Sequence, residues 1–375
     1  MQLTDRTWAE IHLDRLAHNY KTLGSNLPDG CHFLAPIKAD AYGHGAVQVA
    51  HLLTDLGCDY LGVACLSEAM ELRDAGITLP ILIFGYTSPA NALLLAEQGL
   101  TQTIVSLEQA EGISRALDGT GHTLSVHLKL DSGMGRLGFP CRQEPPTEAL
   151  TVMSLPHLQV EGIFTHFAVS DMDDDDYTRS QIGFFTETVD WLDAQSGRKI
   201  QIRHAANSGG VLRFPEAHLN MIRPGISLYG CSPNPELAKG DLQPVMELKT
   251  RVVQVRDFPD GESVSYGRTY KVTGSEKIAA LPIGYADGLP RNLSGRMDML
   301  LHGERVPQVG RICMDTCMLN VSALPKVSAG DVVTVFGHDG KQTQTAHEVA
   351  ELAGTISYEI LSRIGPRTQR VYFSK

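Results

Sequence analysis

Eight short apolar runs alternate with longer amphipathic segments, and this alternation limits the possible folds more than any other feature of the chain. The strand-like runs are 33–37, 60–64, 80–84, 102–105, 124–130, 159–164, 200–203 and 219–222. Helical patterns lie between them, for example at 46–56, 67–76 and 177–195. Alternating strands and helices predict a parallel α/β fold, and eight units favour a closed (β/α)8 barrel of the TIM type. A doubly wound open sheet fits the same alternation and stays the alternative.

The pattern changes after about residue 231, where Pro233 and Pro235 mark a boundary. Strand-like runs separated by Gly, Pro and Asp follow, which predicts a mainly antiparallel β domain. These runs are 247–258, 277–283 and 331–336, with one helical pattern near 347–354.

One strand-like run, 7–13, precedes the barrel pattern and has no place in its count of strands. We predict that it joins the β domain. The predicted domains are therefore a barrel at 14–230 and a β-rich domain formed by 1–13 together with 231–375.

Composition excludes several classes of function. Lys and Arg number 32 and Asp and Glu number 43, so the net charge of −11 argues against non-specific binding of nucleic acid. The N-terminus is polar and no apolar stretch is long enough to span a membrane, so we expect a cytoplasmic protein without a membrane partner. The seven scattered cysteines fit free thiols in a reducing compartment. The acidic run 173–176 lacks the glycine and the terminal glutamate of a calcium loop, and we expect no metal site.

Lys38 directly follows the apolar run 33–37 and is the first candidate functional residue. An ammonium group at the end of a buried strand loses hydration, which lowers a lysine pKa and makes the amine a nucleophile able to form a Schiff base. A lysine that reaches solvent along its own aliphatic stem is the alternative. The phenol of Tyr42 and the glycines at 43 and 45 favour a ligand site, because small residues allow close approach of a ligand.

Polar residues also follow four other predicted strands. The carboxyl ends of barrel strands form one face, so these side chains should meet there with Lys38. They are Lys129, Arg136, His166, Asn207, Ser208 and Arg223.

The segment 130–139 contains Gly133, Gly135 and Gly138 in the spacing GxGxxG. Phe139 and Pro140 follow the third glycine at once, whereas a dinucleotide-binding fingerprint requires a helix there. We therefore reject a dinucleotide site. The turns at 205–210 and 223–227 instead indicate a phosphate site, because small residues expose backbone N–H groups and Ser208 and Ser227 add hydroxyls.

Nine motifs, in order along the chain, resemble a bacterial alanine racemase, a pyridoxal-phosphate enzyme with a barrel domain and a β domain. They are IKADAYGHG, LDSGMGRLGF, THFAVSD, AANSGG, MIRPGISLYG, SVSYGRTY, IGYADGLPR, GRICMD and TISYEI. The resemblance runs from about residue 7 to 373. It implies an isomerase that racemises L- and D-alanine and supplies D-alanine for peptidoglycan.

The resemblance also implies roles for particular residues. Lys38 carries the cofactor and is one catalytic base, while Tyr266 is the other and comes from the partner subunit of a homodimer. Arg223 faces the pyridine nitrogen with His166 behind it, and Arg136 binds the phenolic oxygen of the cofactor. The remaining implied cofactor contacts are Tyr42, Asn207, Ser208, Gly225, Ile226 and Tyr358.

The implied substrate contacts are Arg136, Met314 and Tyr285, the last in an access corridor with Arg291, Arg311 and Asp171. Lys129 matches a lysine that is carbamylated in many members of the family and supports Arg136. An arginine keeps its protons, so Arg223 would leave the pyridine nitrogen a neutral acceptor and restrain side reactions.

Three alternatives stay open. A related barrel-type amino-acid decarboxylase usually places an acid at the pyridine nitrogen, which argues against it here. A non-catalytic pyridoxal-phosphate carrier of barrel form would lack Tyr266. A racemase of serine or of broad specificity differs only in a pocket of about methyl size, which discriminates weakly.

Overall fold

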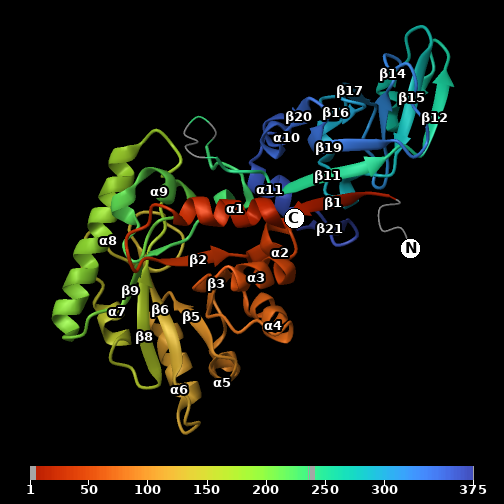
Figure 1. Ribbon diagram of the computed structural model, residues 1–375. Helices are drawn as coiled ribbons and strands as arrows, with labels where there is room; N and C mark the ends of the chain where they lie inside the picture. Colours follow the sequence, from red (N-terminus) through yellow and green to blue (C-terminus); the bar gives the residue numbers. More distant parts are fainter. Residues whose placement is uncertain (1–5, 235, 237–240, 375) are drawn as a thin grey trace. The chain divides into compact units, whose positions relative to one another are not determined.

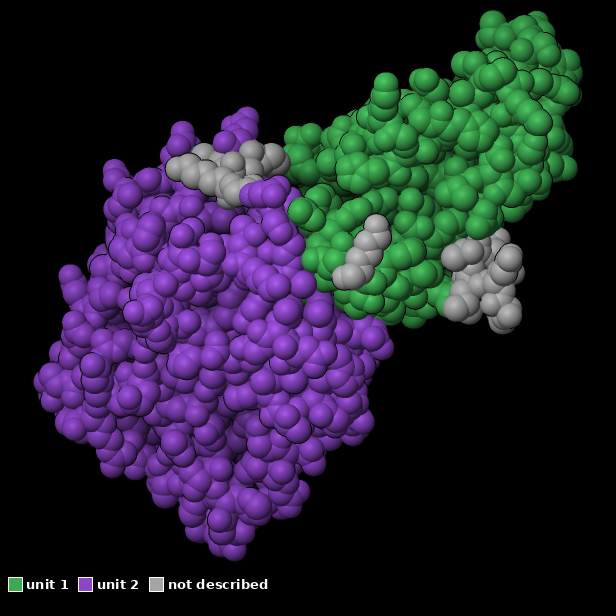
Figure 2. Space-filling model, in the orientation of Figure 1, with its two compact units in different colours: residues 1–16, 42–45, 243–375 green, residues 17–41, 46–242 purple. Residues whose placement is uncertain are grey.

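The computed structural model describes residues 6–234, 236 and 241–374. The chain divides into two compact units, which are coloured separately in Figure 2. Residues 17–41 and 46–242 form the first, here called the barrel unit. Residues 1–16, 42–45 and 243–375 form the second, here called the β unit. Pro235, one of the two predicted boundary markers, lies outside the described residues.

Eight parallel strands close into a barrel in the barrel unit, as predicted. They are β2 (His32–Pro36), β3 (Tyr60–Val63), β4 (Ile81–Ile83), β5 (Leu100–Ile104), β6 (Leu124–Asp131), β8 (Leu158–Phe164), β9 (Ile202–His204) and β10 (Met221–Ile222). Closure follows from two pairings, β10 with β2 and β5 with β6. The open-sheet alternative is therefore wrong. Inside the barrel, Leu34, Leu82 and Met221 are buried against one another.

Helices surround these strands in Figure 1. They are α1 (Leu13–Gly24), α3 (Ala46–Asp55), α4 (Leu66–Asp74), α5 (Ala92–Glu97), α6 (Leu107–Leu117), α7 (Thr147–Val152), α8 (Asp175–Ser196) and α9 (Ser208–Arg213). The acidic run 173–176, for which we expect no calcium site, lies at the start of α8. The Asp174 side chain accepts a hydrogen bond from the Tyr177 N–H and caps that helix. Gly197 ends α8 in a left-handed conformation that favours glycine.

The β unit is built on a mainly antiparallel sheet, as predicted. Its strands are β1 (Trp8–His12), β11 (Met246–Arg251), β12 (Gln254–Phe258), β15 (Glu276–Leu281), β16 (Asp298–Leu301), β17 (Glu304–Val309), β18 (Cys317–Asn320), β19 (Val332–Asp339), β20 (Gln342–Gln344) and β21 (Gln369–Phe373). The leftover strand β1 pairs antiparallel with β11 and parallel with β21, so its predicted place is confirmed. The predicted run 247–258 forms two strands, β11 and β12, because the strand is interrupted at Val252 and Val253.

Shorter elements complete the chain. They are β7 (Phe139–Pro140), β13 (Ser263–Val264), β14 (Tyr270–Lys271), α2 (Lys38–Gly43), α10 (Ala346–Ala353), α11 (Ser357–Ser362), η1 (Pro89–Asn91), η2 (Pro215–Ala217), η3 (Ile226–Tyr229), η5 (Tyr266–Arg268), η6 (Tyr285–Asp287) and η7 (Arg291–Leu293). The predicted helix near 347–354 is α10, which begins with a capping box between Thr345 and Glu348. Within the part of the chain that the structure describes, no helix combines the length and apolarity that a membrane span needs.

Candidate functional site

Lys38 begins α2, two residues after β2 ends. It is half-buried, and burial together with the positive charge of Arg136 lowers the pKa of its ammonium group, against the opposing effect of Glu68. The glutamate also accepts from the Ala39 N–H at 2.7 Å and the Ala64 N–H at 2.7 Å. It thereby ties the first turn after Lys38 to the end of β3. Glu68 lies outside the nine motifs, so the sequence does not indicate this role.

The segment that follows Lys38 is a left-handed turn. Four consecutive non-glycine residues, Ala39 to Tyr42, have φ between 52° and 54°, and Gly43 follows at 84°. Each such residue costs about 1–2 kcal/mol relative to the right-handed conformation. Gly43 itself is required, since a Cβ there would lie 2.2 Å from the carbonyl oxygen of Leu361 in the same unit. Strain of this kind persists where the surrounding contacts hold it, and it concentrates at functional sites.

Substitution of Ala39 by glycine should therefore stabilise the fold. Ala39 is exposed at φ 52°, so the exchange removes the left-handed penalty and little packing. We expect the free energy of unfolding to rise by up to about 1 kcal/mol in urea titrations. The matched control is Ala194→Gly, an exposed position within α8, which should lower it by about 1 kcal/mol. Changes of the same sign in both variants would contradict a strained turn.

Arg223 follows β10 and is buried at 4% exposure. Its Nη2 donates to the carbonyl oxygens of Thr165 at 2.8 Å and Ala205 at 3.0 Å, and its Nη1 donates to His204 Nδ1 at 2.9 Å. Three of its five N–H donors are thus used, and the other two have no hydrogen-bond partner among the described residues. Burial lowers the pKa of Arg223 to about 9, so the side chain is still a cation at neutral pH.

Lys129 lies on β6 and is buried. Its Nζ donates to the carbonyl oxygen of Leu130 at 2.5 Å and lies 5.4 Å from the Phe164 ring. Burial, followed by the charge of Arg223, lowers the pKa of Lys129 to about 7. A substantial fraction of this amine is therefore neutral at physiological pH.

The glycine-rich loop passes over Lys129. Gly138 has φ of 109°, and a Cβ there would lie 2.4 Å from the Lys129 carbonyl oxygen. The loop then enters strand β7 at Phe139, not a helix, which agrees with the rejection of a dinucleotide fingerprint. Arg136 is exposed on this loop.

The two predicted anion-binding turns contact one another in the barrel unit. The Ser208 hydroxyl accepts from the Ser227 N–H at 3.3 Å, and Asn207 caps α9 by accepting from the Gly210 N–H at 3.0 Å. Ser227 Oγ is buried and has no hydrogen-bond partner among the described residues. An unsatisfied hydroxyl costs free energy, which a bound anion would recover. Gly225 and Ile226 lie directly before this hydroxyl, where η3 begins.

His166 follows β8 in the same unit. Burial and the charges of Arg223, Arg136, Lys129 and Lys38 lower its pKa well below the ordinary value. The imidazole is therefore neutral, and it makes no hydrogen bond to other described residues through its ring. A neutral, uncommitted ring is suited to stack on a flat aromatic ligand.

The other predicted site residues belong to the β unit. Tyr266, Met314 and Tyr285 are large side chains that are 73%, 53% and 41% exposed. Tyr42 and Tyr358 lie with ring centroids 6.1 Å apart, and burial raises the pKa of Tyr42. The backbone before Tyr266 is strained, because Ser265 has φ of 67° and is held by donation of its hydroxyl to the Arg311 carbonyl at 2.8 Å.

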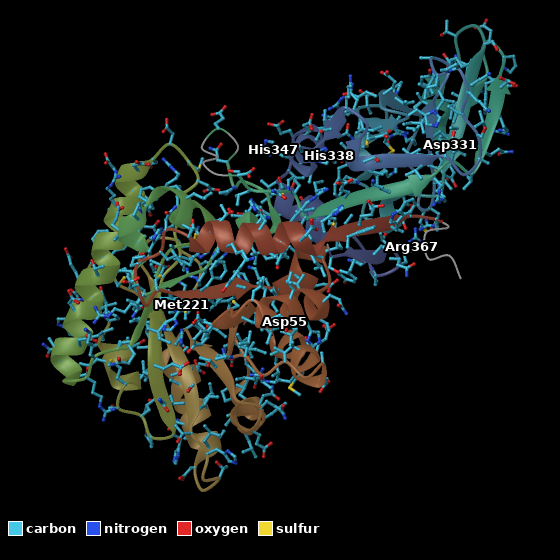
Figure 3. All side chains as sticks on the ribbon, viewed as in Figure 1. Asp55, Met221, Asp331, His338, His347 and Arg367 are labelled. Atoms are coloured by element: carbon cyan, nitrogen blue, oxygen red, sulfur yellow. The ribbon has the colours of Figure 1, made fainter. Side chains whose placement is uncertain are left out.

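A carboxylate within the motif IGYADGLPR, to which the sequence assigned no role, organises the loops of Tyr285 and Met314. Asp287 is fully buried. Its carboxylate accepts hydrogen bonds from Arg6 Nη2 at 2.9 Å, from Arg367 Nε at 2.8 Å and from the Gly284 N–H at 2.8 Å. Arg367 is labelled in Figure 3. Neither arginine lies near Asp287 in the sequence, so only the fold brings these charges together.

This aspartate joins two loops. The Tyr285 N–H donates to the Cys313 carbonyl and the Ala286 N–H to the Met314 carbonyl, both at 3.0 Å. Gly284 permits the contact, because a Cβ there would lie 2.3 Å from the Cys313 carbonyl oxygen. The positions of Tyr285 and Met314 therefore depend on the ion pairs of Asp287.

Asp287→Ala should destabilise the β unit by about 3 kcal/mol. This is the lower end of the range for a broken buried ion pair, since the two guanidinium groups are partly exposed. Urea unfolding followed by circular dichroism measures the change. Asp315→Ala is the control, because Asp315 is 57% exposed in its pair with Arg367 and should cost less than about 1 kcal/mol. Equal losses in the two variants would count against the importance of the buried carboxylate.

Glu10, His12 and Glu247 form the one group of potential metal ligands in the described part of the chain, with ligand atoms within 4.8 Å. Lys249 Nζ lies 3.1 Å from Glu10 and 3.3 Å from Glu247, and Arg15 lies 3.0 Å from Glu247. Two cations thus neutralise the two carboxylates. The cluster is explained as an ion-pair network that ties β1 to β11.

The predicted site residues thus fall into two sets, one in each unit. The barrel unit brings nine of them to the carboxyl ends of its strands or the loops that follow: Lys38, Lys129, Arg136, His166, Asn207, Ser208, Arg223, Gly225 and Ile226. The β unit holds Tyr42, Tyr266, Tyr285, Met314 and Tyr358.

Comparisons with known proteins cover nearly the whole chain. The profile of the alanine racemase N-terminal domain matches residues 11–233, and that of the alanine racemase C-terminal domain matches residues 245–372. The alanine racemase of Desulfovibrio desulfuricans is 47% identical over 366 residues, which are 97% of each chain.

Solved structures agree with this match. The alanine racemase from Bacillus anthracis, solved with bound L-Ala-P, has a TM-score of 0.94 at 37% identity and covers 99% of this chain and 95% of that chain. The histidine racemase from Leuconostoc mesenteroides has a TM-score of 0.89 at 31% identity and covers 99% of this chain and 98% of that chain. The architecture is thus common to racemases named for different amino acids.

Proposed function

Because the chain belongs to the alanine racemase family, we propose that it interconverts L-alanine and D-alanine with pyridoxal 5'-phosphate as its cofactor. One observation carries the proposal furthest. Lys38 follows β2 and Arg223 follows β10, which are neighbouring strands of the closed barrel. A lysine of lowered pKa and a buried cation with two uncommitted donors thus lie at adjacent strand ends.

The chemistry of the barrel unit fits this cofactor. The unsatisfied hydroxyl of Ser227, with Ser208 and the backbone of Gly225 and Ile226, would hold a phosphate. A free N–H of Arg223 would donate to the pyridine nitrogen, and His166 would stack on the ring. Arg136 would bind the phenolic oxygen. The resemblance adds Tyr42 and Tyr358 to the phosphate contacts and Asn207 to the cofactor contacts. We accordingly assign most of the cofactor contacts to the barrel domain.

Two residues of the chain would move the α-proton of alanine. When bound, pyridoxal phosphate supplies an electron sink that makes this proton removable. Lys38 Nζ would hold the cofactor covalently and, once substrate has displaced it, would exchange a proton with one face of Cα. Tyr266 Oη would exchange a proton with the opposite face, so that the configuration inverts.

Tyr266 would act on the site of a second copy of the chain. Its side chain is exposed, and so are those of Met314 and Tyr285 in the same unit. A homodimer with shared sites would cover them. Met314 and Tyr285 would then contact the substrate with Arg136. We also propose, from the family alone, that the enzyme is cytoplasmic and supplies D-alanine for peptidoglycan.

The assay is interconversion of alanine enantiomers by the purified protein, with and without added pyridoxal phosphate, measured by chiral chromatography. We expect racemisation of alanine that added cofactor increases or preserves. Serine and histidine, run at the same concentration, address the broad-specificity alternative, which the histidine racemase of similar fold makes specific. Faster turnover of either than of alanine would reject the assigned substrate, and release of carbon dioxide would indicate a decarboxylase.

Lys129 should become carbamylated as pH rises through about 7. Carbon dioxide reacts with the neutral amine, and burial lowers the pKa of Lys129 to about 7, so the neutral form increases above that pH. The resulting anion would pair with Arg136. Incorporation of ¹³C-labelled bicarbonate, followed by NMR at pH values on either side of 7, measures the reaction. Lys129→Gln supplies the blank, and a signal that persists in it would assign the label elsewhere.

A further inference from the structure

Four side chains form a continuous line of polar contacts inside the barrel. Arg223 Nη1 donates to His204 Nδ1 at 2.9 Å, and His204 Nε2 lies 2.8 Å from His127 Nδ1. His127 Nε2 lies 3.3 Å from Glu161 Oε1, a close polar contact that is not a fully formed hydrogen bond. Thr101 donates its hydroxyl to the same carboxylate oxygen at 3.1 Å.

The direction of every proton in this line follows from Arg223. A guanidinium group only donates, so His204 Nδ1 must accept and the proton of neutral His204 must sit on Nε2. That proton points at His127 Nδ1, which must accept in turn, and the proton of His127 then sits on Nε2, facing Glu161. Protonation of either histidine would set two donors against each other. Both imidazoles must therefore be neutral while the line is intact.

The fold makes specific room for these contacts. Val126 pairs with Val160 and His127 pairs with Gly162, so Glu161 is the extra residue of a β-bulge on β8. Bulges redirect a side chain and recur next to active sites. A Cβ on Gly162 would lie 2.5 Å from the His127 ring, so the glycine permits the ring to occupy its place. The pair Glu161–Gly162 thus serves the placement of one acid and one imidazole.

The line of contacts connects the buried cation of Arg223 to a carboxylate. Within the described residues, no carboxylate contacts the buried guanidinium of Arg223, and the other titratable side chain that acts on His204 besides His127 is the amine of Lys129. Tyr60, whose ring centroid lies 6.4 Å from that of His127, is a phenol whose pKa is raised to about 12 by burial and Glu161, and so adds no charge. Glu161 is the carboxylate in which the line ends.

We propose that Glu161 is a positioning residue that acts through His127 and His204 to fix the orientation of the Arg223 guanidinium towards the cofactor. The proposal rests on the function assigned above and adds to it a residue outside the reacting groups. Loss of the acid removes the carboxylate that faces His127 Nε2, and the imidazole would then no longer hold His204 and Arg223 in one arrangement.

The test reads histidine tautomers directly. Protein labelled with ¹⁵N at histidine is recorded by NMR in its cofactor-free and cofactor-bound forms, with His127→Gln and His204→Gln assigning the two signals. We expect the Nε2–H tautomer for both, with no titration across the ordinary histidine range of about pH 5.5–7.5. Titration of either ring in that range, or an Nδ1–H tautomer, would overturn the proposal.

Three variants separate charge, acceptor and general stability. Glu161→Gln keeps an acceptor oxygen and should preserve both tautomers, whereas Glu161→Leu removes it and should shift the His127 and His204 signals. Glu161→Leu should also lower kcat about 10- to 100-fold, with a smaller change in KM. This is the range for residues that orient the groups in direct contact with the reacting centre. Asp59→Asn is the control, because Asp59 pairs with His32 at 3.0 Å in the same barrel without joining the line.

The outcomes also separate this inference from the assigned function. A wild-type protein that neither binds pyridoxal phosphate nor racemises alanine would reject the function, yet the tautomers would still test the line. An active racemase whose His204 signal is unmoved by Glu161→Leu, or moved equally by Asp59→Asn, would reject the inference alone. If Glu161→Leu does not fold, Glu161→Ala replaces it, because it also removes the acceptor: shifted His127 and His204 signals would support the inference, and unmoved signals would contradict it.

Discussion

Replacement of Lys38 by alanine should abolish racemisation and leave the purified protein colourless. The variant loses both the covalent attachment of the cofactor and one of the two proton-transfer groups. Removal of a general base alone typically costs 10²–10⁴-fold, so we expect a loss of at least roughly 10⁴-fold. Chiral chromatography gives the rate, and visible absorbance before and after borohydride reduction gives the covalent cofactor. Lys199→Ala, an exposed lysine of the same unit, should keep both.

The stability of Lys38→Ala should be equal to or greater than that of the parent protein, although its activity is lost. The pKa of Lys38 is lowered by burial, which means that the folded state disfavours the protonated form that the unfolded chain carries at neutral pH. Replacing it removes this cost, so Lys38→Ala should unfold at an equal or higher urea concentration than the parent. A large drop in stability would mean that lost activity reflects lost folding, and the assignment of Lys38 would then rest on borohydride labelling of the parent protein.

Strand positions and the carboxyl-end residues could be predicted because each depends on local pattern. Apolar runs of four to eight residues identify barrel strands, and the topology of a closed barrel then brings their carboxyl ends together whatever the loops contain. The positions of Lys38 and Arg223 are predictable for this reason. The place of β1 was also predictable, since eight strands complete a barrel and a ninth must pair elsewhere.

The parts that escaped prediction depend on contacts between residues far apart in sequence. Nothing near Asp287 indicates that Arg6 and Arg367 will neutralise it. In the left-handed turn after Lys38, four non-glycine residues, Ala39 to Tyr42, precede the first glycine, so no glycine signals where the turn begins. Nothing in the sequence marks Glu161, because a β-bulge shifts strand register without a characteristic residue pattern. In each case the signal is the tertiary environment.

Tyr266→Phe should slow racemisation by about 10²–10⁴-fold, the usual contribution of one general acid or base. The phenol would serve only one face of Cα, so exchange of the α-proton with deuterated solvent should fall more for one enantiomer than for the other. NMR of alanine during the reaction measures both rates. Tyr270→Phe is a suitable control, because it removes a phenol of the same unit that hydrogen-bonds Glu276 at 2.7 Å and carries no assigned role. Small and equal effects on the two enantiomers would remove Tyr266 from this role.

Mixing the two inactive variants tests whether the site is shared between subunits. In a heterodimer of Lys38→Ala and Tyr266→Phe chains, one site would combine the intact lysine of one chain with the intact tyrosine of the other, while the second site would have neither. Random exchange makes half of the dimers heterodimers, so activity should return to about one quarter of the parent value. Differently tagged chains, purified over both tags, confirm that heterodimers formed. Tagged heterodimers without activity would place both groups in one subunit's site, because a site built within a single chain cannot be repaired by its partner.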